Sequence, residues 1–323
     1  MAGAREPPER ANLGPMTLGP NEGVVLVAHG TVSSLDELPE FLKSVRRGRP
    51  APDALVAEMR RRYEAIGGSP LLEATRAQAT ALARALDAPV LVAMRLWRPP
   101  VEQTLYAAAE LGLERVVILP MAPFSVHVYW QAALACLRAV TAELGVRAPK
   151  LVSVEPWGLE PDFVIAHAEL IERALARADP KSALLLTAHS LPRKVIEGGD
   201  PYAEQVAKTA AAIAEKLDRG YELVYQSQGD EGGPWLGPDL PEMFSRIART
   251  GAKSVVVAPI GFLAEHVETL YDLDIEAVRL AREHGLELVR VPALGTHPGL
   301  IRALARVAER AVANIPPKAN GSA

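Results

Sequence analysis

The sequence is short of cysteine, of net charge and of long apolar runs, and each shortage excludes a class of protein. Cys136 is the only cysteine among the 323 residues, so the chain cannot form an internal disulfide or supply a four-cysteine iron–sulfur or zinc site. The formal charge of -4 argues against a nucleic-acid-binding protein. No apolar run approaches the roughly 18 residues that cross a membrane, so we expect no integral membrane segment. A single cysteine fits a reducing compartment, and we expect a cytoplasmic protein.

The sequence also lacks the loops that bind nucleotide phosphates, since neither GxGxxG nor GxxxxGK[ST] occurs in it. Its first twenty residues hold charges and prolines without the apolar stretch of a signal peptide. We expect residues 1–20 and 316–323 to be disordered tails.

Short apolar runs alternate with stretches of helical periodicity along the rest of the chain. Apolar runs without polar alternation are typical of strands buried on both faces of a parallel sheet. Strands that alternate with helices indicate a parallel α/β sheet with right-handed crossovers. The predicted strands are Val24–Ala28, Pro89–Met94, Val116–Pro120, Leu151–Val154, Leu184–Ala188, Glu222–Gln226, Val255–Pro259 and Glu287–Val291. The clearest predicted helices are Pro70–Leu86, Val101–Leu111, Trp130–Leu144 and Pro201–Leu217.

The predicted strands divide into four and four, and the first strand of each set ends in Ala-His. This repetition indicates two similar α/β halves, each a four-stranded parallel sheet flanked by helices. We place the halves at residues 21–158 and 159–315, because residues 154–163 carry two prolines and a glycine.

Two histidines, His29 and His189, follow directly on buried strands. Ligands of open α/β sheets bind beyond the carboxyl ends of the strands, so a cleft between the halves would gather both side chains. A histidine at a strand end is commonly a hydrogen-bonded structural residue, and that alternative stays open for each residue taken alone.

Three carboxylates follow one another at intervals of four residues in the segment GFLAEHVETLYDLDIEAV, which we expect to be helical from Ala264. Glu268, Asp272 and Glu276 would stack on one helix face, where like charges repel unless water or cations surround them. Imidazole and carboxylate are suitable ligands for a divalent transition metal, and His189 could meet Glu268 at one ion. A solvated acidic stripe is the alternative explanation.

A strongly basic segment, residues 44–71, stands out in this acidic protein. Arginine binds carboxylates in bidentate geometry, so the segment would fit a substrate with carboxylate groups. A solvated helix face is again the alternative. Its arginines are Arg46, Arg47, Arg49, Arg60, Arg61 and Arg62.

Several segments, in this order and spacing, resemble the ferrochelatase family. They are RRGR…RRRYEAIGGSPL, TAHSLP, GDPY, QSQG…PWLGPD and GFLAEHVETLYDLDIE. The resemblance extends from Val24 to Val312. It implies two Rossmann-like halves of the chelatase type around a porphyrin cleft, and insertion of Fe²⁺ into protoporphyrin IX or coproporphyrin III with release of two protons, in haem biosynthesis. Iron is then a substrate, and no cofactor is expected.

The resemblance also implies roles for individual residues. The metal-site histidine of the family falls on His189 and its glutamate on Glu268, with an outer metal path through Asp272 and Glu276. His29 stands where compact members have tyrosine, and we expect it to line the pocket as an axial neighbour of the metal. Porphyrin contacts are implied at Arg46, Arg62, Tyr63, Ser69 and Tyr129. An apolar slot for the ring is predicted from Met121, Phe124, Tyr129, Trp235, Leu236 and Phe262.

Two other functions remain possible on the sequence. One is a cobalt or nickel chelatase for a sirohydrochlorin-type ring, because small chelatases also have strands that end in AHG. The other is a non-enzymatic haem-binding module on the same fold. The PWLGP and EHVETLYD segments and the retained His189 and Glu268 favour the ferrochelatase interpretation.

The cysteine content leads to a test that needs no structure. We predict that the purified protein, free of porphyrin, contains no iron–sulfur cluster, because Cys136 is the only thiolate in each chain. Iron and acid-labile sulfide analysis, with a visible absorption spectrum, measures this. A stoichiometric cluster in each monomer would contradict the prediction.

Overall fold

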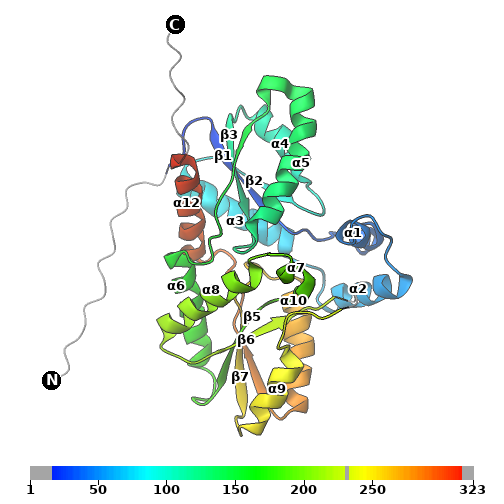
Figure 1. The fold of residues 1–323 in the computed structure, drawn as a ribbon, viewed down its shortest axis with the longest axis vertical. Coiled ribbons are helices and arrows are strands. Elements are labelled where there is room, and N and C mark those ends of the chain that lie inside the picture. The colour runs from blue at the N-terminus through cyan, green and yellow to red at the C-terminus, as the bar shows by residue number, and fades with distance from the viewer. Residues whose placement is uncertain (1–16, 230–232, 315–323) are drawn as a thin grey trace, which may run out of the picture.

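The computed structural model describes residues 17–229 and 233–314 and contains two four-stranded parallel sheets (Figure 1). All the predicted strands are present, and their ends differ from the predicted ones by at most two residues. The first sheet contains β1 (Glu22–Ala28), β2 (Val90–Met94), β3 (Arg115–Pro120) and β4 (Lys150–Val152). The second contains β5 (Ala183–His189), β6 (Glu222–Gln226), β7 (Ser254–Pro259) and β8 (Glu287–Arg290).

The two sheets have the same topology. The strand order is β2-β1-β3-β4 in the first sheet and β6-β5-β7-β8 in the second, so the first strand of each set lies inside its sheet. β1 and β5 are therefore hydrogen-bonded on both sides, as their apolar composition predicts. The predicted fold class, two similar α/β units of the chelatase type, is confirmed.

Helices connect the strands and cover both faces of each sheet (Figure 1). Two one-turn 3-10 helices, η1 (Leu35–Glu37) and η2 (Gly145–Arg147), and a π-helical segment, η3 (Asp272–Ala277), complete the described structure. The α-helices are α1 (Leu38–Val45), α2 (Asp53–Ala65), α3 (Leu71–Leu86), α4 (Val101–Glu110), α5 (Val126–Leu144), α6 (Pro161–Leu175), α7 (Arg193–Glu197), α8 (Tyr202–Leu217), α9 (Leu240–Arg249), α10 (Val267–Leu270), α11 (Val278–Glu283) and α12 (Pro298–Ala313). No helix in these described ranges is long and apolar enough to cross a membrane.

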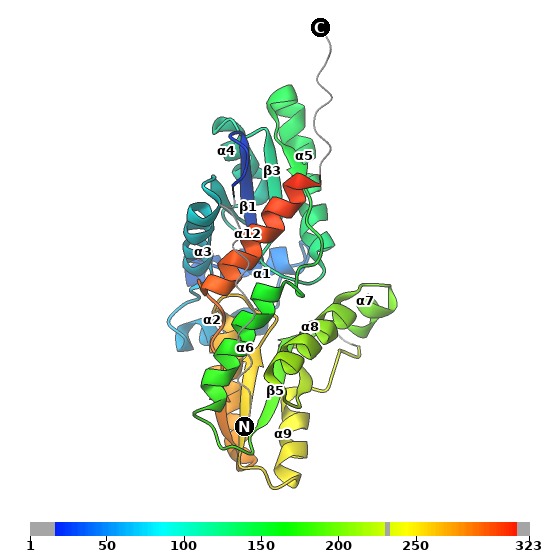
Figure 2. The same cartoon turned by 90° about the vertical axis from the view of Figure 1, so that its left-hand side faces the viewer.

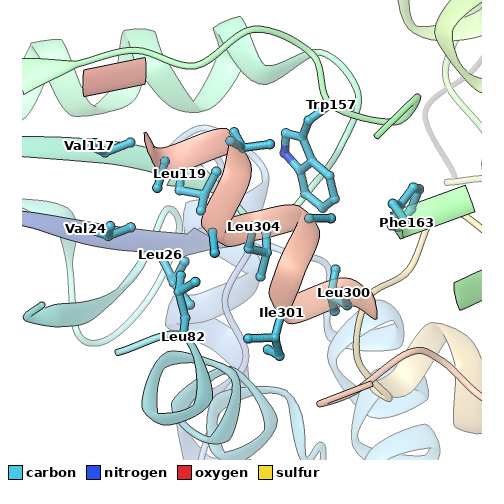
Figure 3. Packing of buried hydrophobic residues seen from close by; sticks show 14 of the residues in the cluster. Val24, Leu26, Leu82, Val117, Leu119, Trp157, Phe163, Leu300, Ile301 and Leu304 are labelled. Carbon is cyan, nitrogen blue, oxygen red and sulfur yellow. The ribbon is translucent and has the colours of Figure 1, made fainter. Parts of the chain in front are cut away.

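The first sheet buries alternate side chains on its two faces. Val24 and Leu26 of β1 pack with α3 and α12, whereas Val25 and Val27 pack with α4 and α5. Figure 3 shows α12 against Val24 and Leu26, with Leu304 between the helix and the strands. Leu304 is completely buried, so its truncation to alanine would cost roughly 2–5 kcal/mol of stability.

The second sheet is covered in the same manner. Leu185 of β5 packs with α9 and α11, whereas Leu184 and Leu186 pack with α6 and α8. The inner strands β1, β3, β5 and β7 are thus almost completely buried, and their side chains are unavailable for binding. The chemistry must lie at the strand ends.

The C-terminal helix α12 joins the two units. It follows β8 of the second sheet, yet it packs on α3 and β3 of the first sheet and on α6 (Figure 2). The division of the chain at residue 158 stays a prediction, and the last helix of the predicted second unit lies on the first sheet. The predicted tails fall outside the described residues, except for residues 17–20.

Two helical predictions were wrong at their starts. α5 begins at Val126 instead of Trp130, because the chain turns at Ser125, which has a positive φ of 46°. The acidic segment begins its helix at Val267 instead of Ala264, since His266 has the extended backbone of an N-cap residue. Its next turns are π-helical, so the expected regular stacking at intervals of four residues is interrupted at η3.

A buried histidine lies between α6 and α12. His167 is 2% exposed, and its Nε2 has no hydrogen-bond partner in the described structure. Its ring packs edge-on against Phe163 at 4.6 Å between centroids. Burial, and the nearby His297, lower the pKa of His167 to about 3, so the ring is neutral in the folded protein.

We predict that His167 makes the protein sensitive to acid. The unfolded chain takes up this proton below about pH 6.5 while the folded protein does not, so the stabilisation present above that pH is lost as the pH falls. Between pH 7 and pH 4.5 the free energy of unfolding of the wild type should fall by about 2–3 kcal/mol more than that of His167→Leu, measured by urea denaturation. The exposed His284→Gln serves as the control and should follow the wild type. Parallel curves for the wild type and His167→Leu would contradict this role.

Candidate active site

The carboxyl ends of the strands bring functional side chains from both sheets together. His29 follows β1, His189 ends β5, and Gln226 ends β6. The segment after β7 adds His266 and Glu268, which lie at the start of α10. The expected gathering of strand-end residues is therefore present in the structure, with Glu268 at its centre.

Glu268 lies between two histidines. Its Oε2 is 3.7 Å from His189 Nε2 and 3.7 Å from His266 Nε2. These distances are longer than hydrogen bonds, and the contacts are electrostatic. The Glu268 side chain is 28% exposed and that of His189 36%, so both can be reached from solvent, whereas His266 is 15% exposed.

The histidines keep Glu268 ionised. Burial alone would raise the pKa of this carboxyl, but the nearby imidazoles of His189 and His266 outweigh burial and lower the pKa to about 2. The same pairing acts on His266 in the opposite direction. Burial opposes its protonation, but the Glu268 carboxylate raises the pKa of His266 above its ordinary value.

Backbone carbonyls fix which ring nitrogen of each histidine carries a proton. His189 Nδ1 lies against the carbonyl oxygen of Ser190, and His266 Nδ1 lies 3.1 Å from the carbonyl oxygen of Ala264. A carbonyl only accepts hydrogen bonds, so each Nδ1 must donate. A neutral His189 therefore turns the lone pair of Nε2 towards Glu268, where it can bind a metal ion or accept a proton.

His29 contributes a third imidazole to this group. Its Nδ1 is 3.4 Å from Arg95 Nη2, and the Arg95 guanidinium lies 5.3 Å from the centre of the Tyr129 ring. His29 is exposed to solvent in this structure, and the protein around it and the Arg95 charge lower the pKa of its ring below the ordinary value. His29 is therefore neutral near pH 7, and Tyr129 lies on the same side of the site.

The backbone of Glu268 is held by the second sheet. Gln226 Nε2 donates to the carbonyl oxygen of Glu268 at 2.9 Å, and Thr187 Oγ1 donates to Gln226 Oε1 at 2.7 Å. Thr269 caps the start of α10 by accepting from the His266 amide at 3.0 Å. Two strands and a cap thus fix the position of the carboxylate.

A cavity of about 590 Å³ lies between the loop after β1 and the turn from α2 to α3, and neither Glu268 nor any of the three histidines lines it. Tyr63 and Ser69, both implied porphyrin contacts, line it, and the Tyr63 hydroxyl is 3.0 Å from Thr31 Oγ1. Gly67 and Gly68 form the turn with positive φ angles of 70° and 95°. The cavity lining reaches Thr31, two residues beyond His29.

The family resemblance implied that Arg62 contacts the porphyrin and that Asp272 belongs to the metal path. In the structure these two side chains pair with one another. Arg62 Nη1 is 3.1 Å from Asp272 Oδ1, and Arg62 Nε is 2.7 Å from Glu58 Oε1. Burial raises the pKa of Asp272 to about 6 even though Ser227 donates a hydrogen bond to it and Arg62 is close. An implied porphyrin contact and an implied metal carboxylate are therefore joined to each other.

The remaining predicted residues occupy varied surroundings. Glu276 is half-buried near Arg62 and Asp272, and Arg46 ends α1 with a buried Nε that has no partner among the described residues. Most of the predicted slot residues pack within the protein. Phe124 is 3% exposed against Tyr202, Met121 packs on the cluster between the first sheet and α12, and Tyr129 and Leu236 are partly buried against other clusters. Phe262 is 8% exposed, and its ring lies 5.0 Å from that of His266.

The sequence interpretation overlooked His266 and Arg95. His266 lies in the EHVETLYD segment, but a histidine two residues before a glutamate has no distinctive spacing. Only the extended backbone at His266 turns its ring back towards Glu268. Within residues 17–229 and 233–314, no three His, Cys, Asp or Glu side chains form a ready metal site.

The family model and the relatives that match this sequence indicate the same family. The family model for ferrochelatase matches residues 21–312. A ferrochelatase from Acidobacterium capsulatum is 35% identical over 310 residues, covering 88% of this chain and 93% of the relative. A coproporphyrin III ferrochelatase from Anoxybacillus flavithermus is 35% identical over 303 residues, covering 88% of this chain and 94% of the relative.

Solved structures support the fold. SirB from Bacillus subtilis, determined with Fe³⁺, has a TM-score of 0.58 at 14% identity, covering 91% of this chain and 96% of SirB. CbiX, described as the terminal enzyme of sirohaem biosynthesis in denitrifying bacteria, has a TM-score of 0.52 at 17% identity, covering 90% of this chain and 99% of CbiX. At sequence identities this low, these structures show only that the fold is shared.

The electrostatic link between Glu268 and His266 can be tested without substrate. Glu268→Gln removes the carboxylate that favours the imidazolium form, so the pKa of His266 should fall. A pH titration of the imidazole resonances by NMR measures this. Glu276→Gln, which changes a carboxylate further along the same segment, should leave the His266 titration unchanged. An unaltered His266 pKa in Glu268→Gln would contradict the pairing.

Proposed function

Because the chain belongs to the ferrochelatase family, enzymes that insert a metal ion into a porphyrin, we propose that its metal substrate is Fe²⁺ and that its porphyrin carries carboxylates, as a step of haem formation. The reaction releases two protons, since each of two pyrrole N–H bonds breaks and its electron pair binds iron. The observation that carries the proposal is the position of ionised Glu268 between His189 and His266 at the strand ends.

The charges of these residues suit both tasks of the reaction. Carboxylate oxygen and imidazole nitrogen are suitable ligands for Fe²⁺. A neutral His189 with a free Nε2 can also accept a pyrrole proton, and Glu268 can balance the resulting imidazolium. His266, already paired with Glu268, can hold positive charge until a proton leaves to solvent.

The residues around His29 suit the porphyrin. The ring is flat and apolar with carboxylates on its edge, so it needs an apolar slot and a few polar contacts. Tyr129, His29 and the cavity beside Tyr63 lie on the first-sheet side of Glu268. Bending of the macrocycle between these walls would expose the nitrogen lone pairs on one face for the metal.

The outer carboxylates suit delivery of iron. Asp272 and Glu276 follow Glu268 along the chain, and Asp272 is paired with Arg62. A porphyrin carboxylate that takes Arg62 would release Asp272 towards the metal. The porphyrin and the iron would then each bind a different partner of one ion pair.

The proposed activity can be assayed directly. Anaerobic incubation with Fe²⁺ and either protoporphyrin IX or coproporphyrin III, followed at the Soret band, should show metal insertion, and the rates with the two porphyrins identify the preferred one. Co²⁺ or Ni²⁺ with a sirohydrochlorin-type ring provides the comparison. Insertion confined to the second pair of substrates would contradict ferrous iron as the metal.

His189 should be required for insertion and dispensable for porphyrin binding. His189→Ala removes the available Nε2, so the insertion rate should fall by about 100-fold or more. Porphyrin affinity, measured by quenching of porphyrin fluorescence, should change little. A variant that inserts Fe²⁺ at a near wild-type rate would show that His189 is not catalytic.

The three carboxylates should have unequal effects. Glu268→Gln should lower kcat and kcat/KM together, because it removes an interaction needed in the transition state. Asp272→Asn and Glu276→Gln should mainly raise the apparent KM for iron if they only deliver it. Steady-state kinetics with varied Fe²⁺ at saturating porphyrin separate these results. Equal, small effects of all three changes would instead indicate a solvated acidic stripe.

A further inference from the structure

The GDPY segment after α7 has no place in the site described so far, yet it contacts His189. The Tyr202 hydroxyl donates a hydrogen bond of 2.8 Å to the carbonyl oxygen of His189. The ladder between β5 and β7 ends at Thr187, two residues earlier, so the pairing with β7 does not extend to His189. Burial raises the pKa of Tyr202 above its ordinary value, which keeps the hydroxyl protonated as a donor.

Asp200 connects Tyr202 to the loop that follows β3 of the first sheet. Its Oδ1 accepts from the Tyr202 amide at 2.9 Å and from Ser125 Oγ at 2.6 Å. His127 Nε2 lies 3.4 Å from the other carboxylate oxygen. The Asp200 side chain is 11% exposed, so these bonds are shielded from competing water.

A second set of contacts runs parallel to the first. Gln205 Oε1 accepts from the Ser125 amide at 2.9 Å, which holds Ser125 in its left-handed conformation. The Phe124 ring meets the Tyr202 ring edge-on, with centroids 5.9 Å apart. Phe124 and Tyr202 also pack in one cluster with Ala188, the residue before His189.

We propose that Tyr202 is a positioning residue that couples His189 to Phe124 and Ser125, the end of the loop that follows β3. The chain of contacts runs from Ser125 through Asp200 and Tyr202 to the His189 backbone. That loop continues into α5, which carries Tyr129, so one network sets both the porphyrin wall and the histidine beside Glu268. The kinetic part of this inference rests on the proposed function.

The test removes a single hydroxyl. In Tyr202→Phe the ring still packs on Phe124, but the hydrogen bond to His189 is lost. The kcat for Fe²⁺ insertion should fall about fivefold to tenfold, the change that corresponds to one hydrogen bond, while the KM for porphyrin changes less than twofold. In the metal-free protein the imidazole NMR resonances of His189 should shift or broaden, a readout that requires no turnover.

Two matched comparisons separate positioning from general stability. Tyr225 is 6% exposed in the same cluster, and within the described residues no hydrogen bond joins its hydroxyl to His189, so Tyr225→Phe should keep the wild-type kcat and His189 resonances. Asp200→Ala should reproduce the loss in Tyr202→Phe. Asp200→Asn retains the Oδ1 acceptor for Ser125 and Tyr202 and should restore most of the activity.

The outcomes are distinct. A lower kcat and altered His189 resonances in Tyr202→Phe, with neither change in Tyr225→Phe, support the inference. Unaltered His189 resonances in Tyr202→Phe, or equal effects of both tyrosine changes, overturn it. Absence of Fe²⁺ insertion by the wild type overturns the proposed function, and the NMR comparison still decides whether Tyr202 positions His189.

Discussion

The ionised carboxylate of Glu268 is the interaction on which the rest of the site depends. A carboxylate that is largely surrounded by protein needs positive or polar partners, and here two imidazoles supply them at 3.7 Å. The partners come from β5 and from the segment after β7, while Gln226 of β6 holds the backbone of Glu268. The environment of this charge therefore depends on the relative positions of three strand ends of one sheet. The charge also raises the pKa of His266.

The first sheet completes the site because the two sheets are held in one arrangement. α12 returns from the second sheet to pack on the first, and Gln78 of α3 donates hydrogen bonds to the carbonyls of Leu263 and Gly295, at 3.0 and 2.8 Å. Gln78 is completely buried, so these bonds are protected. His29 and the cavity beside Tyr63 are thereby held next to Glu268. Both sheets have the same strand order, yet the groups proposed to bind the metal lie mainly on the second and the surfaces proposed for the ring on the first.

The basic segment and the acidic segment are a single electrostatic unit in the folded protein. Arg62 bridges Glu58 of α2 and Asp272 of η3, and its guanidinium lies 5.0 Å from the centre of the Tyr271 ring. The π-helical turn at η3 displaces the regular spacing of the carboxylates and brings Asp272 beneath Ser227. An arginine and a carboxylate that would each suit a separate substrate are thus paired with one another.

The sequence by itself determined the strands, their parallel arrangement in two sets of four, and the family, because buried strands and long motifs are local patterns of apolar and polar residues. It also placed His29 and His189 at strand ends, since the carboxyl ends of parallel strands share an edge. Only the tertiary structure decided which side chains meet there. His266 joins Glu268 through an extended backbone at one residue, Arg62 pairs with a residue 210 positions away, and α12 crosses to the other sheet. These contacts depend on packing between distant segments, which local periodicity does not encode.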